Sequence, residues 1–178
     1  QNGAAWSLLD MLDGVHCPLV AGQLPCRVRR VQADCRAFMQ RFNFQIATLP
    51  VNHPGGAIGC RIEHGGRSFV YIPDNELNAR NPTTSYPDIV AFCRGADVLC
   101  HDAQYLFGEL TARHGWGHSC VSETCELAIA AQVRHLVLFH HDPGRMDEAL
   151  QEVERRAQDH LAPHGITCTA AYEGLSLD

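Results

Sequence analysis

Two strand-like runs on either side of a glycine pair constrain this chain more than any other feature. Residues 57–64 and 67–72 flank Gly65-Gly66, and two glycines between two strand patterns are a strong hairpin signal. Residues 44–51 predict another strand just before this hairpin. We therefore expect an antiparallel β-sheet in this part of the chain.

The second half of the chain alternates between helical and strand patterns, which is typical of the α/β class. Residues 77–85 and 103–118 are polar or glycine-rich and predict loops. The pattern predicts helices over 86–94, 119–131 and 146–161, and strands over 97–100, 134–139 and 168–177. We expect one mixed sheet with flanking helices.

The length of 178 residues predicts a single domain over 1–178. Residues 1–25 predict an N-terminal helix over 6–13 and a following loop, and 26–33 alternate like a strand. No secretory signal opens the sequence and no run of 18 apolar residues occurs, so we expect no contact with a membrane and a cytoplasmic location.

The charged residues exclude several functions. The net charge is −6, which disfavours strong binding to the phosphates of duplex nucleic acid. All 14 basic residues are arginines. Without lysine, the chain has neither a Schiff-base nucleophile nor a Walker-type phosphate loop.

The nine cysteines predict buried free thiols rather than disulfides. Their number is odd, their spacing is irregular and no Cys-x-x-Cys motif occurs. Several lie in apolar runs, where a thiol behaves as a small hydrophobic group. These features favour a reducing compartment and disfavour a small redox protein.

Ionisable residues follow three of the expected strands. His53 comes soon after Val51, Asp74 after Ile72, and His140 directly after Phe139. His53 alone is also typical of a turn and Asp74 of a cap, whereas His140-His141-Asp142 after an apolar strand is less easily explained in this way. Together they indicate a site at the strand ends of a sheet, with imidazole and carboxylate groups that suit a metal such as Zn²⁺.

Five segments in order resemble the metallo-β-lactamase fold, in the branch that includes transfer-RNA 3′-processing endonucleases and phosphodiesterases. The likeness runs from about residue 45 to residue 150. The segments are His53-Pro-Gly-Gly-Ala-Ile-Gly-Cys-Arg-Ile-Glu63, Val70-Tyr-Ile-Pro-Asp74-Asn75, His101-Asp102-Ala103, Gly117-His118-Ser119 and Leu136-Val-Leu-Phe-His140. Cys60 replaces a usual aromatic residue, and Pro73 a usual glycine.

The resemblance implies a fold of the αββα sandwich type and a metal-dependent hydrolase that acts through a metal-activated hydroxide. It implies that His53, Asp74 and His140 are metal ligands, with Asp74 between two metals, Zn²⁺ by preference and Mn or Fe as alternatives. It also implies that His118 donates a proton to the leaving group or holds an anionic substrate, oriented by Asp102. The substrate would be a phosphodiester-like or related ester, of a small-molecule or nucleotide type.

One family motif is missing from this sequence. The family's first metal motif, His-x-His-x-Asp-His, does not occur. We therefore interpret the chain as the C-terminal half of the fold, either a fragment or a natural half-domain. We expect partial or absent metal occupancy and an inactive chain when it stands alone.

Two functional hypotheses follow from this interpretation. One is the metal-dependent hydrolase. The other is a non-catalytic half-domain with a structural or partner-binding role. In either case the missing half would leave a sheet face uncovered, so we expect a homodimer or association with the missing N-terminal half.

Overall fold

The computed structural model describes residues 36–177, and the predictions for residues 1–25 and 26–33 fall outside this range. The described residues lie in one compact unit, Ala33–Asp178. The helices are α2 (Arg36–Phe42), α3 (Tyr86–Cys93), α4 (Phe107–Leu110), α5 (Val121–Ala131), α6 (Asp147–Leu161) and the 3₁₀ turn η2 (Ala162–His164). The strands are β1 (Phe44–Val51), β2 (Ala57–His64), β3 (Arg67–Ile72), β4 (Val98–Asp102), β5 (His135–Phe139) and β6 (Thr167–Ala170).

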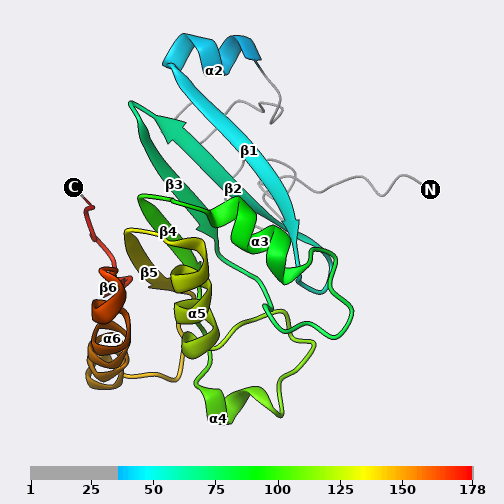
Figure 1. Cartoon of the computed structure of the whole chain (residues 1–178). Coiled ribbons are helices and arrows are strands. Elements are labelled where there is room, and N and C mark those ends of the chain that lie inside the picture. Colours follow the sequence, from blue (N-terminus) through cyan, green and yellow to red (C-terminus); the bar gives the residue numbers. More distant parts are fainter. Residues whose placement is uncertain (1–35, 178) are drawn as a thin grey trace, which may run out of the picture. The chain divides into compact units, whose positions relative to one another are not determined.

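The strands form a single mixed sheet in the order β1-β2-β3-β4-β5-β6 (Figure 1). Strands β1, β2 and β3 pair antiparallel, and β2 and β3 form the predicted hairpin around Gly65-Gly66. From β3 to β6 every pair is parallel. The predicted α/β class, with one mixed sheet and flanking helices, is confirmed.

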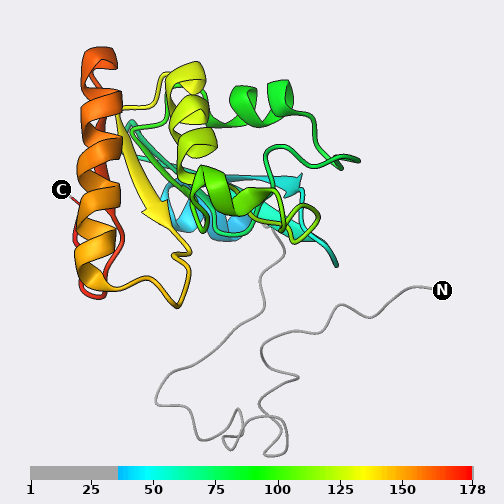
Figure 2. The ribbon, with the colours of Figure 1, turned by 90° about the horizontal axis from the view of Figure 1, so that it is seen from below.

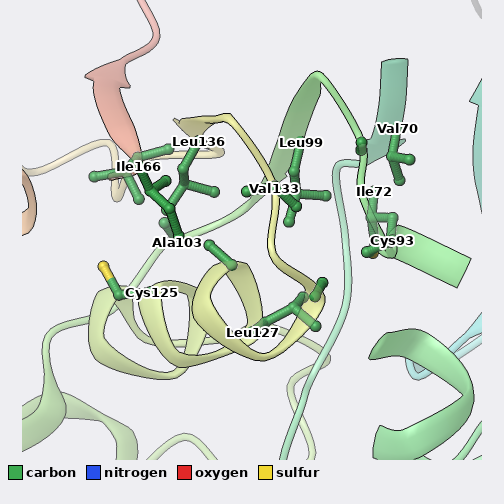
Figure 3. Close-up of a cluster of buried hydrophobic side chains, with 14 of the residues drawn as sticks. Val70, Ile72, Cys93, Leu99, Ala103, Cys125, Leu127, Val133, Leu136 and Ile166 are labelled. Carbon is green, nitrogen blue, oxygen red and sulfur yellow. The ribbon is translucent and has the colours of Figure 1, made fainter. Parts of the chain in front are cut away.

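Helices α3, α5 and α6 lie on one side of the sheet (Figure 2). The core forms between these helices and alternate residues of the strands, where Leu99 and Leu136 face Leu127 of α5 (Figure 3). Helix α6 is amphipathic and buries Val153 and Leu161. This burial, at roughly 1.5–3 kcal/mol for each large apolar side chain, is the main force that holds the helices on the sheet.

Short elements and one strand end differ from the sequence prediction. Helix α2 was not predicted, and α4 lies within the segment 103–118 that was expected to be a loop. Strand β6 ends at Ala170 instead of reaching residue 177, because the next residues turn and Leu175 N–H donates to Tyr172 O. No helix within residues 36–177 is long and apolar enough to cross a bilayer.

The topology sends the C-terminal ends of five strands to the same edge of the sheet, and β6 is one of them. Since β1 and β3 run in the same direction as β4 and β5, their C-terminal ends lie side by side. Crevices outside such ends are where open α/β sheets bind ligands.

Candidate metal centre

The predicted site residues come from these strand ends. His53 follows β1, Asp74 follows β3, Asp102 ends β4 and His140 follows β5. His118 comes from the loop that leads into α5. These residues are separated by up to 87 positions in sequence (140 − 53), and the topology of the sheet and the loop before α5 bring them together.

Asp74 lies beside all three imidazoles. His140 Nε2 is 3.2 Å from Asp74 Oδ1. One ligand atom each of His53, Asp74 and His118 lies within 4.8 Å of the other two, and the rings of His118 and His140 have centroids 4.5 Å apart. The structure therefore adds His118 to the three residues expected to converge, while metal binding by them stays a prediction.

The carboxylate of Asp102 holds His118. His118 Nδ1 lies 2.6 Å from Asp102 Oδ2, and Asp102 is fully buried. This hydrogen bond, helped by the charges of Asp102 and Asp74, raises the pKa of His118 although burial opposes the shift. Asp102 also caps the turn after β4, because its Oδ1 accepts from Gln104 N–H at 3.1 Å. Asp102 therefore contacts both the His118 ring and the backbone of the turn.

His53 has an open imidazole. Within residues 36–177 no hydrogen bond is made by its ring nitrogens, so both are free to bind a cation. The ring packs against the backbone of Gly117, which has φ +91°. A Cβ at Gly117 would lie 2.5 Å from Pro54 Cδ and closer still to His53 Cδ2, so this position requires glycine.

A second buried carboxylate, Glu76, fixes the loop that carries His118. Glu76 is 3% exposed. Its oxygens accept from Gly115 N–H at 2.9 Å and from Gly117 N–H at 3.1 Å. These hydrogen bonds hold Gly117 beside His53 and fix the loop that carries His118.

Buried polar side chains connect the strand ends below the site. Asn75 Oδ1 accepts from Asn52 N–H at 2.9 Å, and Asn75 Nδ2 lies 3.1 Å from His101 Nε2. His101 Nδ1 donates to the carbonyl of Asp102. Burial lowers the pKa of His101, so this imidazole is neutral and serves the network as one donor and one acceptor.

Sequence reasoning missed Asn52, Asn75, Glu76 and Gln104, which all support the predicted site residues. Gln104 Nε2 lies 3.0 Å from His140 Nδ1. These residues do share one signal, since each directly follows a strand or lies within four positions of its end. Their partners are 23 to 41 residues away in sequence, and no local pattern indicates such contacts.

A cleft of about 500 Å³ opens beside His53. It lies between the loop after β3 and the loop before α5. Its walls include His53, Glu76, Arg80, Asn81, Thr111 and His114. Within the described residues Arg80 makes no ion pair. Its guanidinium is therefore available to bind an anionic group in the cleft.

Comparisons with known proteins identify the family. The family model "Beta-lactamase superfamily domain" matches residues 8–141, which is most of the chain. The chain belongs to the beta-lactamase superfamily. The resemblance inferred from the sequence motifs is thus confirmed at the level of the family.

The relatives of this superfamily member include several proteins named ribonuclease Z. The protein from Halalkalibacterium halodurans is 31% identical over 97 residues, which cover 54% of this chain and 28% of the relative. The protein from Trichodesmium erythraeum is 31% identical over 116 residues, 61% of this chain and 34% of the relative. The chain therefore spans about a third of the length of these curated relatives.

Solved structures share the fold. The metallo-beta-lactamase fold protein YhfI from Bacillus subtilis has a TM-score of 0.59 at 20% identity and covers 74% of this chain and 47% of its own. Human tRNase Z, short form, has a TM-score of 0.53 at 17% identity, with 74% and 42% covered. In both cases the likeness extends over less than half of the longer protein.

Proposed function

We propose that this superfamily member forms part of a metal-dependent hydrolase that cleaves a phosphodiester bond. The observation that carries the proposal is the position of Asp74. Its carboxylate forms one cluster with His53 and His118 and lies 3.2 Å from His140 Nε2. Asp102 holds His118 beside it. Polar groups of these types, gathered in a crevice at strand ends, form the constellation expected of a hydrolytic site.

The donor set suits a borderline divalent metal. Two imidazoles and one carboxylate are ligands of Zn²⁺, with Mn and Fe as alternatives. His53, Asp74 and His140 would hold the metal, and the free ring nitrogens of His53 fit this role. When bound, a divalent metal lowers the pKa of water and neutralises charge on the scissile group.

The residues of the chain supply the proton chemistry. His118 is held through Nδ1 by Asp102, which leaves Nε2 directed at the substrate side. The hydrogen bond to Asp102 raises the pKa of His118, which favours the protonated ring that would donate to the departing oxygen. Asp102 is the orienting partner that keeps the proton on Nδ1.

A phosphodiester of RNA is the substrate class that we propose. The relatives that support it are named ribonuclease Z. Arg80 in the cleft beside His53 supports it as well, because guanidinium groups bind phosphate oxygens in a bidentate way. The negative net charge argues for local contacts to a strand rather than broad binding of a duplex.

A non-catalytic role is the second candidate. The observation that favours it is the absence of a His-x-His-x-Asp-His motif from these 178 residues. His53, Asp74 and His140 would supply three metal ligands, fewer than a two-metal site requires. The same site would then serve as a structural piece or a partner-binding surface.

Zinc titration of the purified, chelator-treated chain tests the proposal. We expect wild-type protein to bind Zn²⁺, and Asp74→Ala to weaken binding at least 10-fold, since Asp74 touches every other proposed ligand. Asp159→Ala is the matched control, because Asp159 is exposed on α6 and is not one of the proposed ligands. Equal Zn²⁺ affinity of wild type and Asp74→Ala would contradict the ligand assignment.

Hydrolysis separates the two candidates. A protein that contains this chain and an upstream His-x-His-x-Asp-His motif should cleave bis(p-nitrophenyl) phosphate and a 3′-extended RNA. His118→Ala should then reduce turnover by 10²–10⁴-fold and leave metal content nearly unchanged. Equal loss of turnover and metal would make His118 structural, and a metal-loaded protein without turnover would favour the half-domain.

A further inference from the structure

Gln104 joins two residues of the proposed site. It lies two positions after the end of β4 and is 9% exposed. Its side-chain Nε2 is 3.0 Å from His140 Nδ1, and its backbone N–H donates to Asp102 Oδ1. One residue therefore contacts both a proposed metal ligand and the carboxylate that holds His118.

The backbone of Gln104 is fixed from the other side by Arg145. Arg145 Nη2 donates to Gln104 O at 3.2 Å and to Glu109 Oε2 at 2.9 Å. The Arg145 side chain is only 11% exposed. Because the backbone is held by Asp102 and Arg145, the buried amide of Gln104 stays beside His140.

The position of the proton on His140 follows from its two neighbours. Asp74 Oδ1, 3.2 Å from His140 Nε2, is a carboxylate oxygen and can only accept. A neutral His140 thus carries its proton on Nε2, and its Nδ1 is an acceptor. The NH₂ group of Gln104 is the donor that Nδ1 needs.

A cation on His140 Nε2 reverses this pattern. The metallated nitrogen has no proton, so the proton moves to Nδ1, which then requires an acceptor. A rotation of the Gln104 amide by half a turn places its oxygen there. Glutamine offers both a donor and an acceptor from the same position, which neither glutamate nor methionine does.

We propose that Gln104 is the positioning residue of His140, pairing with Nδ1 through its NH₂ group in the metal-free protein and through its oxygen when a cation occupies Nε2. His140 has φ +57°, a backbone conformation that neighbouring contacts must hold in place. The part that concerns the cation rests on the proposed function, and the part that concerns the metal-free tautomer does not.

The metal-free tautomer is tested by long-range ¹H–¹⁵N NMR of the ¹⁵N-labelled chain, with His140 assigned by comparison with His140→Gln. At about pH 8.5, two units above an ordinary imidazole pKa, wild type should show the proton on Nε2. Gln104→Glu places an acceptor at Nδ1 while Asp74 still accepts at Nε2, so Nδ1 should gain a proton and Nε2 should keep its own. Asn81→Asp adds the same charge in the neighbouring cleft, and we expect no change.

The cation-dependent part is tested by Co²⁺ titration. Gln104→Met should lower Co²⁺ affinity about 10–100-fold, the usual effect of losing such a partner, and Gln104→Glu should restore it because its oxygen accepts from Nδ1–H. Asn81→Asp corrects for added charge. A purely structural role for Gln104 predicts equal losses in Gln104→Met and Gln104→Glu.

Three results would overturn the proposal. They are a proton on Nδ1 alone of His140 in the metal-free wild type, no proton on Nδ1 in Gln104→Glu, and equal Co²⁺ affinities of wild type and Gln104→Met. A chain that binds no Co²⁺ would instead contradict the proposed function, and the tautomer measurement would then decide the role of Gln104 alone.

Discussion

At the scale of single residues, two independent features require glycine at position 117, beside the proposed site. Its φ of +91° already favours glycine, and its Cα lies against His53 and Pro54. Gly115, two positions earlier, has φ +85° but no atom within 4 Å of an added Cβ. The two glycines therefore share the backbone conformation and differ in the contact.

Alanine substitutions at these two glycines separate strain from contact. Gly115→Ala should cost about 1–2 kcal/mol of unfolding free energy, the range for a strained backbone. Gly117→Ala should cost about 1–3 kcal/mol more, as an overpacked core position does, and should also shift the NMR signals of the His53 ring. Urea unfolding measures the free energy of unfolding of both variants. Equal decreases would show that the contact with His53 does not contribute to the cost of Gly117→Ala.

Asp97 predicts a pH-dependent stability at the other end of the sheet. Its Oδ2 accepts from Ser68 N–H at 2.7 Å, and this bond, with further help from Ser68 Oγ and Arg134, lowers the pKa of Asp97. A lowered native pKa stabilises the fold at pH values above the unfolded pKa of about 3.9. That stability is lost as the pH falls through the native pKa.

Replacing Asp97 by Asn tests this pH dependence. Asp97→Asn should be about 1–2 kcal/mol less stable than wild type at pH 7, the size of a hydrogen bond to a charged group. The gap should narrow as the pH falls from 5 towards 3, because wild-type Asp97 then becomes protonated. Urea unfolding at several pH values measures it. Asp159→Asn, in an exposed ion pair on α6, should change little, and a constant gap for Asp97→Asn would refute the assignment.

At the scale of secondary-structure elements, Arg61 of β2 connects the sheet to the end of α3. Its Nη1 donates to Phe92 O at 3.0 Å and Arg94 O at 3.1 Å. These carbonyls lie at or just beyond the last turn of the helix, where intrahelical donors run out. A cation at this end also interacts favourably with the helix dipole.

Removing this cation should loosen α3. Arg61→Met keeps the aliphatic stem and should lower the unfolding free energy by about 1–3 kcal/mol, with faster amide exchange around residues 91–95. Arg67→Met is the matched control. Arg67 lies on the neighbouring strand, and within the described residues its side chain makes no ion pair or hydrogen bond. Equal effects of both substitutions would mean that Arg61 does not cap the helix.

Sequence patterns predicted the elements that have a periodicity of their own. The bounds of β1, β2 and β3 agree residue for residue, because alternation and the Gly65-Gly66 turn define them. Helix α4 has four residues and depends on Glu109, which accepts from Leu106 N–H and from Arg145. Contacts with residues far away in sequence hold such an element, and the same is true of Glu76 and Gln104. Local sequence patterns therefore did not predict them.

At the scale of the whole molecule, helices α3, α5 and α6 cover only one face of the sheet (Figure 2). Apolar side chains of β2 and β3 lie on the opposite face. The register places Ile58, Ile62, Phe69 and Tyr71 on the face opposite the core residues Val70 and Ile72. Ile58 is 61% exposed, and the other three are half-buried. Contiguous apolar surface of this kind usually marks an interface.

We predict that a second copy of the chain covers this face. A two-fold related pair would place the same strands of both copies against each other, and it should bury more than about 1,000 Å², the lower bound of a specific interface.

Light scattering should give twice the chain mass at micromolar concentration. Ile58→Glu should shift the protein towards monomer, because it buries a charge in the contact. Met146→Glu, at a 72% exposed position before α6, should leave the dimer intact. A folded wild-type monomer, with no co-purified upstream fragment by mass, would contradict the prediction and leave association with an N-terminal half as the way to cover these strands.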